Sequence, residues 1–196
     1  VIGRTPEQYT LHLTDEETAM LTRVNSVFER TVLVIAAPGY LELNEAALSC
    51  GAIVFLGLAG QETGGALADV LTAKVMPSGH LAHSWPEAAD SFREACTAAD
   101  QFSGLRYFDS FGTPMRYPFG HGLSYGTIEF GSVSAGLDGC DVSVSAELVN
   151  TGSRFAASEL VQVYVTRPAG DLSRPVSFLD CFRKSRLLAP GERQTI

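Results

Sequence analysis

The sequence is poor in basic residues, and those present do not gather into a patch. It holds 14 Lys and Arg against 22 Asp and Glu, for a formal net charge of −8. Such a surface does not attract phosphate backbones or anionic lipids, so we expect no nucleic acid and no membrane among the partners. No apolar run approaches the ~18 residues of a membrane span, and no signal peptide is visible. The first residue is Val1 rather than Met, which suggests a cut chain.

Motifs for metal binding are also missing. The four cysteines are Cys50, Cys96, Cys140 and Cys181. No CxxC spacing occurs among them, which argues against a zinc site. They are either free thiols, or Cys140 and Cys181 form a disulfide bond. The histidines at 80, 83 and 121 fit no zinc pattern either. We therefore expect no metal.

Two further classes of site are disfavoured by what the sequence lacks. The run Gly60–Gly65 (GQETGG) has the glycines of a phosphate-binding loop but not its Lys-Ser/Thr. We interpret it as a tight turn, with Glu62 as a partner of the dipole of the helix that follows. No GxSxG motif supports a serine hydrolase, and we expect no cofactor.

Residues 1–86 alternate strand-like and helix-like segments, which predicts an α/β domain with parallel strands and right-handed crossovers. Apolar runs at 31–37 and 52–58 are typical of buried parallel strands. Thr14 and Glu17 form a capping box before a helix with helical apolar spacing, and Asn44 can cap a second helix. A third helix is expected over 64–73, with Ala66, Leu67, Val70 and Leu71 facing inward.

The chain changes character after residue 86. Residues 87–126 form a connector, in which we expect a short helix over 88–99. The aromatic and glycine-rich part that follows (104–125) has neither helical nor strand periodicity, and its aromatics either pack the connector or offer a platform for sugars. From residue 127 the pattern alternates, as in Val142, Val144 and Ala146, which is typical of antiparallel strands. About four strands fit before Ile196, whereas a complete sandwich of this kind needs about seven.

Two long motifs carry a family resemblance. The run GLRYFDSFGTPMRYPFGHGLSY (104–125) resembles the "YRYFD … YPFGHGLSY" signature of glycoside hydrolase family 3, and GQETGGALADVLTAKVMPSGHLAHSWP (60–86) resembles an earlier signature of that family. Residues 141–196 resemble the fibronectin type III-like domain of many members. The resemblance implies a parallel three-layer α/β sandwich (1–86, N-terminally incomplete), the connector (87–126) and a truncated fibronectin III/immunoglobulin-like β-sandwich (127–196, C-terminally incomplete).

The same resemblance implies an activity. Members of the β-glucosidase type remove terminal non-reducing β-linked sugars with retention, which needs a nucleophile and an acid/base. The nucleophile is an aspartate on a (β/α)8 barrel, and no segment here resembles its motif, so the missing barrel is an expected partner, before or after this region. Val1–Tyr9 (VIGRTPEQY) aligns with the loop "viGR-sGEGyDR", which matches Glu7 to the acid/base. Pro6 and Gln8 depart from the flanking glycines.

Two hypotheses of function follow. In the first, the chain is part of a glycosidase acting on an oligosaccharide or an aryl or alkyl β-glycoside, with Glu7 as acid/base and Arg4 and Tyr9 orienting the sugar. In the second, it is a non-catalytic module that binds carbohydrate or mediates assembly. Exposure of Glu7 toward a docking face favours the first, and burial in an ion pair favours the second. Either way, the chain alone is expected to hydrolyse nothing.

Overall fold

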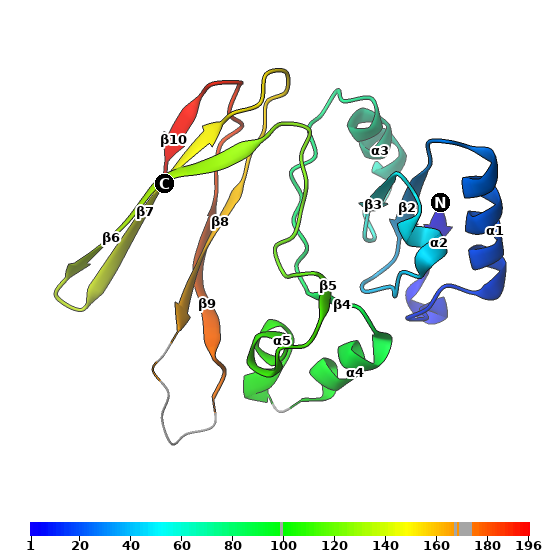
Figure 1. The fold of residues 1–196 in the computed structure, drawn as a ribbon, viewed down its shortest axis with the longest axis horizontal. Helices are drawn as coiled ribbons and strands as arrows, with labels where there is room; N and C mark the ends of the chain where they lie inside the picture. The colour runs from blue at the N-terminus through cyan, green and yellow to red at the C-terminus, as the bar shows by residue number, and fades with distance from the viewer. Residues whose placement is uncertain (99, 167, 169–173) are drawn as a thin grey trace.

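The computed structural model describes residues 1–98, 100–166, 168 and 174–196. Figure 1 shows two units side by side, with the α/β unit on the right and the β-strands on the left. The first unit has a parallel sheet in the order β1 (Ile2–Gly3), β2 (Val32–Ala36) and β3 (Ala52–Phe55). Its register pairs Ile2 with Ile35 and Ile35 with Phe55. The predicted parallel strands are thus confirmed. The expectation that both are buried holds for the middle of β2 but was wrong for β3, which is an edge strand with no buried residue.

Helices lie on both sides of this sheet, as expected for three layers (Figure 1). α1 (Asp15–Val27) starts at the predicted capping box, since the Thr14 hydroxyl accepts from the Glu17 amide and the Glu17 carboxylate accepts from the Thr14 amide. α2 (Glu45–Leu48) starts at Asn44, whose side chain accepts from the amide of Ala47. Side chains that satisfy these first amides fix where each helix begins.

The third helix, α3 (Thr63–Leu71), corrects one expectation. None of its residues is buried, and two of the four side chains predicted to face inward, Ala66 and Leu71, are exposed. Leu67 and Val70 are half-buried. The apolar spacing identified the helix correctly, but the described chain supplies too little surface to cover that face.

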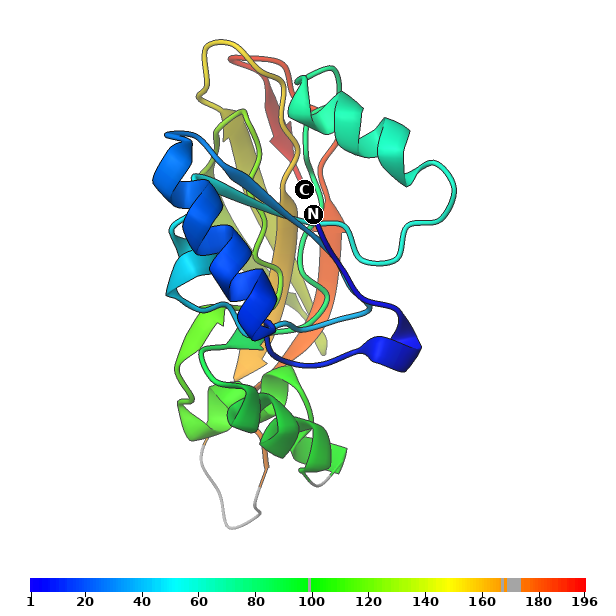
Figure 2. The ribbon, with the colours of Figure 1, turned by 90° about the vertical axis from the view of Figure 1, so that its right-hand side faces the viewer.

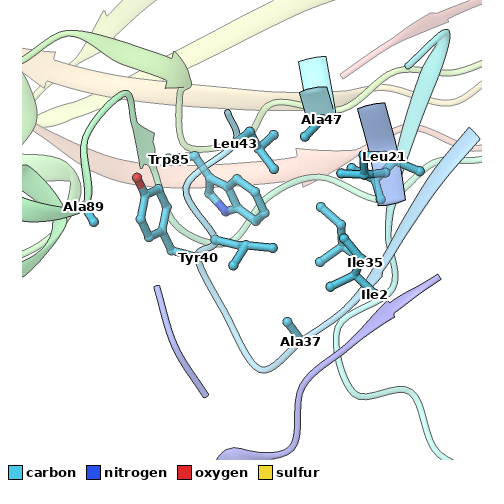
Figure 3. Close-up of a cluster of buried hydrophobic side chains, with 11 residues drawn as sticks. Ile2, Leu21, Ile35, Ala37, Tyr40, Leu43, Ala47, Trp85 and Ala89 are labelled. Atoms are coloured by element: carbon cyan, nitrogen blue, oxygen red, sulfur yellow. The ribbon is translucent and has the colours of Figure 1, made fainter. Parts of the chain in front are cut away.

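The core of the α/β unit runs from the sheet to the start of the connector (Figure 3). Tyr40 lies between two aromatic rings: it stacks on Phe92 with centroids 4.6 Å apart and meets the edge of Trp85 at 5.6 Å. Its hydroxyl donates to the Pro86 carbonyl at 3.2 Å. The remaining buried members of this core are Ile2, Leu21, Leu33, Ile35, Ala37, Leu41, Leu43, Ala47 and Ala89.

The connector is more regular than its sequence indicates. β4 (Trp85–Pro86) pairs with β5 (Met115–Tyr117), and the chain between them forms α4 (Ala89–Thr97), η2 (Asp100–Phe102) and α5 (Leu105–Phe111). The helix expected over 88–99 is therefore confirmed as α4, with residue 99 outside the described residues. The absence of a helix in 104–125 was wrong, because α5 forms there between two glycines of positive φ, Gly104 and Gly112.

The second unit is antiparallel, as predicted. One sheet has the order β10 (Arg193–Thr195), β7 (Asp141–Asn150) and β6 (Ile128–Asp138), and a hairpin joins β8 (Leu160–Thr166) to β9 (Ser177–Lys184). The described residues thus hold five strands rather than about four. The alternation in β7 marks the strand correctly, but Val142 is 67% exposed while Ala146 is buried, so only the later half of β7 faces the core.

Contacts between the two units come from the two signature motifs. Lys184 on β9 donates to the Ser78 carbonyl at 2.5 Å and to its hydroxyl at 2.9 Å. Within the first unit and its connector, the two motifs also touch each other: Gly122 packs on the backbone of Gly79, where an added Cβ would lie 2.2 Å from the carbonyl oxygen. The second glycine of the "GHG" run is therefore needed for a close approach between backbones.

All four cysteines are free thiols in this structure, so the Cys140–Cys181 alternative is not formed. Within the described residues, no helix has the length and apolar character to cross a bilayer.

Candidate functional site

Glu7 lies at the apex of a loop that leaves the carboxyl end of β1. The loop makes one 3-10 turn, η1 (Pro6–Gln8), which begins at a proline. Glu7 is exposed. Its own backbone amide and the Thr5 hydroxyl both hydrogen-bond the carboxylate, and these bonds hold the pKa of Glu7 below its usual range. A general acid requires the opposite shift, so the described chain presents Glu7 as a carboxylate.

The loop after β3 reaches the same edge of the sheet. Parallel strands end at one edge, where ligands bind in open α/β sheets. Figure 2 shows η1 and the segment before α3 projecting on the same side of the molecule. In this segment Gly57 and Gly60 have positive φ of 62° and 79°, and Leu58 is 57% exposed. Glu7 therefore stands on an open edge that offers apolar as well as acidic surface.

The Arg4 side chain is turned toward α1. Its guanidinium binds both carboxylate oxygens of Glu17 on α1, each at 2.5 Å, and its side chain is only 8% exposed. The hydrogen bond from Arg4 lowers the pKa of Glu17, and the same bond raises the pKa of Arg4. A guanidinium committed to a planar carboxylate has few donors left for a sugar.

Tyr9 also points into the protein. Its hydroxyl donates to the backbone carbonyl of Tyr40, and its ring packs against the core of the α/β unit. Burial raises the pKa of the phenol. The structure therefore does not bring Arg4, Glu7 and Tyr9 together around one ligand: Glu7 is outside, and the other two bind the protein itself.

The histidines hold structural positions. His80 Nδ1 lies 2.9 Å from the Gly120 carbonyl, His83 Nε2 accepts from the Trp85 indole at 3.0 Å, and His121 stacks on Tyr117. Nowhere in the described part of the chain do three or more His, Cys, Asp or Glu side chains gather as metal ligands would. Glu62 occupies the N-cap position of α3, as its expected role at that helix end requires.

Most aromatics of the connector pack against the protein, with Phe108 buried, whereas Phe111 and Tyr125 are exposed. Tyr107 and Phe111 have ring centroids 4.8 Å apart, Tyr117 meets Trp85, and the Tyr125 hydroxyl donates to the Val70 carbonyl. Two hollows of about 500 and 530 Å³ lie between the units, and Glu7 lines neither.

Comparison with known families accounts for both units. The family model described as "Glycosyl hydrolase family 3 C-terminal domain" matches residues 3–125, more than half of the chain. The chain belongs to glycosyl hydrolase family 3. A model described as "Fibronectin type III-like domain" matches residues 159–196, which confirms the resemblance of the second unit.

The relatives of this chain in family 3 carry the names of different glycosidases. A β-glucosidase of Kluyveromyces marxianus is 36% identical over 74% of this chain and 18% of its own length. An exo-alpha-(1->6)-L-arabinopyranosidase of Bifidobacterium longum is 33% identical over 95% of this chain and 26% of its own. β-Glucosidase 3B of Thermotoga neapolitana, solved with glucose, superposes with a TM-score of 0.88 at 30% identity, covering 98% of this chain and 29% of that one. The chain thus spans about a quarter of these family 3 proteins.

The structure adds residues that the sequence did not single out for the site. Thr5 supplies a hydroxyl to Glu7, and Glu17 binds Arg4 from a position 13 residues away. Glu17 was recognised only as a helix cap, because no spacing rule links a loop arginine to a carboxylate on the following helix.

Proposed function

We propose that this chain is part of a retaining glycosidase that removes terminal non-reducing β-linked sugars, in the manner of a β-glucosidase. Membership of family 3 supports the reaction class, and the names of the relatives support a glycosidase. The substrate would be an oligosaccharide or an aryl or alkyl β-glycoside. The three described parallel strands are far from the eight of a (β/α)8 barrel, so the nucleophile would come from a barrel outside these residues.

Glu7 would act as the acid/base. The observation that carries this assignment is its exposure at the carboxyl edge of the parallel sheet, without an ion pair among the described residues. In the first step its proton would pass to the glycosidic oxygen while the barrel carboxylate, ~5–5.5 Å away, attacks the anomeric carbon. In the second step Glu7, now a carboxylate, would take a proton from a water molecule that attacks the anomeric carbon and breaks its bond to the barrel carboxylate.

A barrel docked over the loop would have to reverse the present electrostatics of Glu7. Removal of water from the carboxylate disfavours its charged form and raises its pKa. Displacement of the Thr5 hydroxyl would act in the same direction. The isolated chain, with a lowered Glu7 pKa and one carboxylate of the pair, should therefore hydrolyse no glycoside.

The second candidate, a non-catalytic module for carbohydrate binding or assembly, rests on the inward orientation of Arg4 and Tyr9. It predicts that substitution of Glu7 leaves the activity of the intact protein unchanged.

The test compares Glu7→Gln with the unsubstituted intact protein on a panel of 4-nitrophenyl glycosides. Glu16→Gln is the matched control, because Glu16 is also exposed and bonded to its own amide and to a threonine hydroxyl. We expect the activity to fall by about 100-fold or more for Glu7→Gln and not for the control. Added azide should restore activity to the Glu7→Gln variant, with a glycosyl azide as the product. Equal activity of both variants would assign the acid/base elsewhere.

A further inference from the structure

The loop that carries Glu7 is bound to the rest of the protein at both ends, whereas Glu7 at its apex is exposed. Arg4, three residues before Glu7, is 8% exposed at its side chain, and Tyr9, two residues after it, is half-buried against the core. Glu7 between them is exposed and has no ion-pair partner among the described residues. In a six-residue loop held in this way, the residues at the two ends can determine the position of the Glu7 side chain without contacting it.

The first anchor joins the loop to the sheet and to α1. The Arg4 amide donates to the Ala36 carbonyl at 2.8 Å, which continues the ladder of β1 on β2. Its guanidinium binds Glu17 through two parallel bonds, and that carboxylate also accepts from the Thr14 amide at 2.9 Å. Because the carboxylate is fixed to the helix cap, the guanidinium has one orientation available to it.

The second anchor joins the loop to the aromatic core. The Tyr9 hydroxyl donates to the Tyr40 carbonyl, and Tyr40 is itself 1% exposed between Trp85 and Phe92. The hydroxyl lies beside Gly39, where an added Cβ would approach it to 3.3 Å. A larger residue at 39 would press on the phenol, so the glycine keeps this contact open.

We propose that Arg4 and Tyr9 are positioning residues that hold the Glu7 carboxylate in place for proton transfer, rather than residues that bind the sugar. The inference rests on the proposed function of Glu7 as acid/base. Pro6 restricts the backbone between the anchors by fixing its own φ. A displacement of about 1 Å in such a group can cost on the order of 100-fold in rate.

The leaving group of the substrate separates positioning from general damage. A poor leaving group such as an alkoxide needs the proton of the acid, whereas 2,4-dinitrophenolate leaves without it. A displaced acid therefore lowers kcat/KM for an alkyl glycoside and leaves the dinitrophenyl glycoside nearly unchanged. Partial unfolding lowers both equally, because it reduces the amount of active enzyme.

The experiment measures kcat/KM of the intact protein for both substrates after Arg4→Met, Arg4→Lys and Tyr9→Phe. We expect Arg4→Met to lose roughly 10–100-fold on the alkyl glycoside and less than about 3-fold on the dinitrophenyl glycoside. Arg4→Lys keeps the charge but not the two parallel bonds, and should fall between. Arg93→Met, which breaks the exposed pair with Asp90 on α4, is the control and should change neither value.

Equal losses on both substrates, or none, would overturn the inference. If Arg4→Met does not fold, Tyr9→Phe decides, since it removes a single hydroxyl and keeps the ring in the core. Glu7→Gln is measured alongside: a selective loss there without one at Arg4 or Tyr9 refutes only the positioning role. No selective loss at Glu7 refutes the proposed function itself, and the positioning role with it.

Discussion

Asn150, at the end of β7, is a fully buried amide whose three hydrogen bonds join the turns of the second unit. Its Nδ2 donates to the carbonyls of Phe155 at 3.0 Å and Leu188 at 2.8 Å, and its Oδ1 accepts from the Gly152 amide at 2.9 Å. Asn150→Asp keeps the shape but turns both donors into an acceptor. The Phe155 carbonyl then loses the amide donor, the Leu188 carbonyl keeps only the Ala157 amide at 3.0 Å, and both face a buried carboxylate. Each of the two lost bonds, replaced by a contact between like partial charges, costs ~1–3 kcal/mol, so we expect a loss of about 4 kcal/mol at pH 7.

Urea denaturation followed by far-UV circular dichroism measures this loss. With a slope of about 2 kcal/mol/M, 4 kcal/mol corresponds to a midpoint lowered by about 2 M. The new carboxyl group faces two carbonyl oxygens, so its pKa in the folded protein is raised above that in the unfolded chain. The loss of folding stability therefore becomes smaller as the pH falls toward 4 and the group is protonated. Asn44→Asp is the control, because Asn and Asp cap helices about equally well and the Thr18 hydroxyl, which accepts from the Asn44 amide at 2.8 Å, can donate to a carboxylate instead. A shift below 0.5 M, taken as about a quarter of the expected one, or a shift independent of pH, would refute this account of Asn150.

Three further predictions concern the signature motif, the candidate acid and the core. Gly122→Ala places a Cβ 2.2 Å from a backbone carbonyl and should cost roughly 2–3 kcal/mol of folding stability in urea; an unchanged midpoint would show that the backbones separate freely. Thr5→Val removes a hydrogen bond to the Glu7 carboxylate, so its pKa should rise toward the ordinary range in a ¹³C NMR titration, and a fall would contradict the sign. Tyr40→Phe leaves the Pro86 carbonyl without its buried donor and should cost about 1–2 kcal/mol, read by thermal unfolding, whereas a gain in stability would contradict the bond.

The sequence was sufficient where local chemistry decides the structure. The capping box at Thr14 and Glu17, the cap at Asn44 and the apolar runs of β2 and β3 each depend on residues a few positions apart. The change of pattern along the chain indicated an α/β unit followed by an antiparallel one, and the family resemblance indicated which sandwich each belongs to. These parts of the fold were predicted and are confirmed.

The sequence was insufficient where distant partners decide. α5 is a helix of only seven residues, so its helical spacing, such as the packed pair of Tyr107 and Phe111, is hidden in an irregular run. Partners in other segments also hold it: Tyr107 reaches Glu94 on α4, and Asp109 accepts from Ser177 on β9. The roles first given to Arg4 and Tyr9 depend on Glu17 and Tyr40, which lie 13 and 31 residues away. Such pairings follow from the packing of elements and leave no local pattern. The role of Glu7 stays a prediction.

The hydrogen bond between Trp85 and His83 makes the fluorescence of Trp85 sensitive to the structure around it. Trp85 is the one tryptophan of the sequence, and its indole donates to His83 Nε2, which must therefore be unprotonated. Burial lowers the pKa of His83, so the unfolded chain takes up this proton before the folded one, and acidification below about 6.5 weakens the fold. When His83 does become protonated, Nε2 changes from acceptor to donor and the indole loses its partner. The fluorescence emission of Trp85 therefore reports, without an added label, whether the connector packs against the sheet.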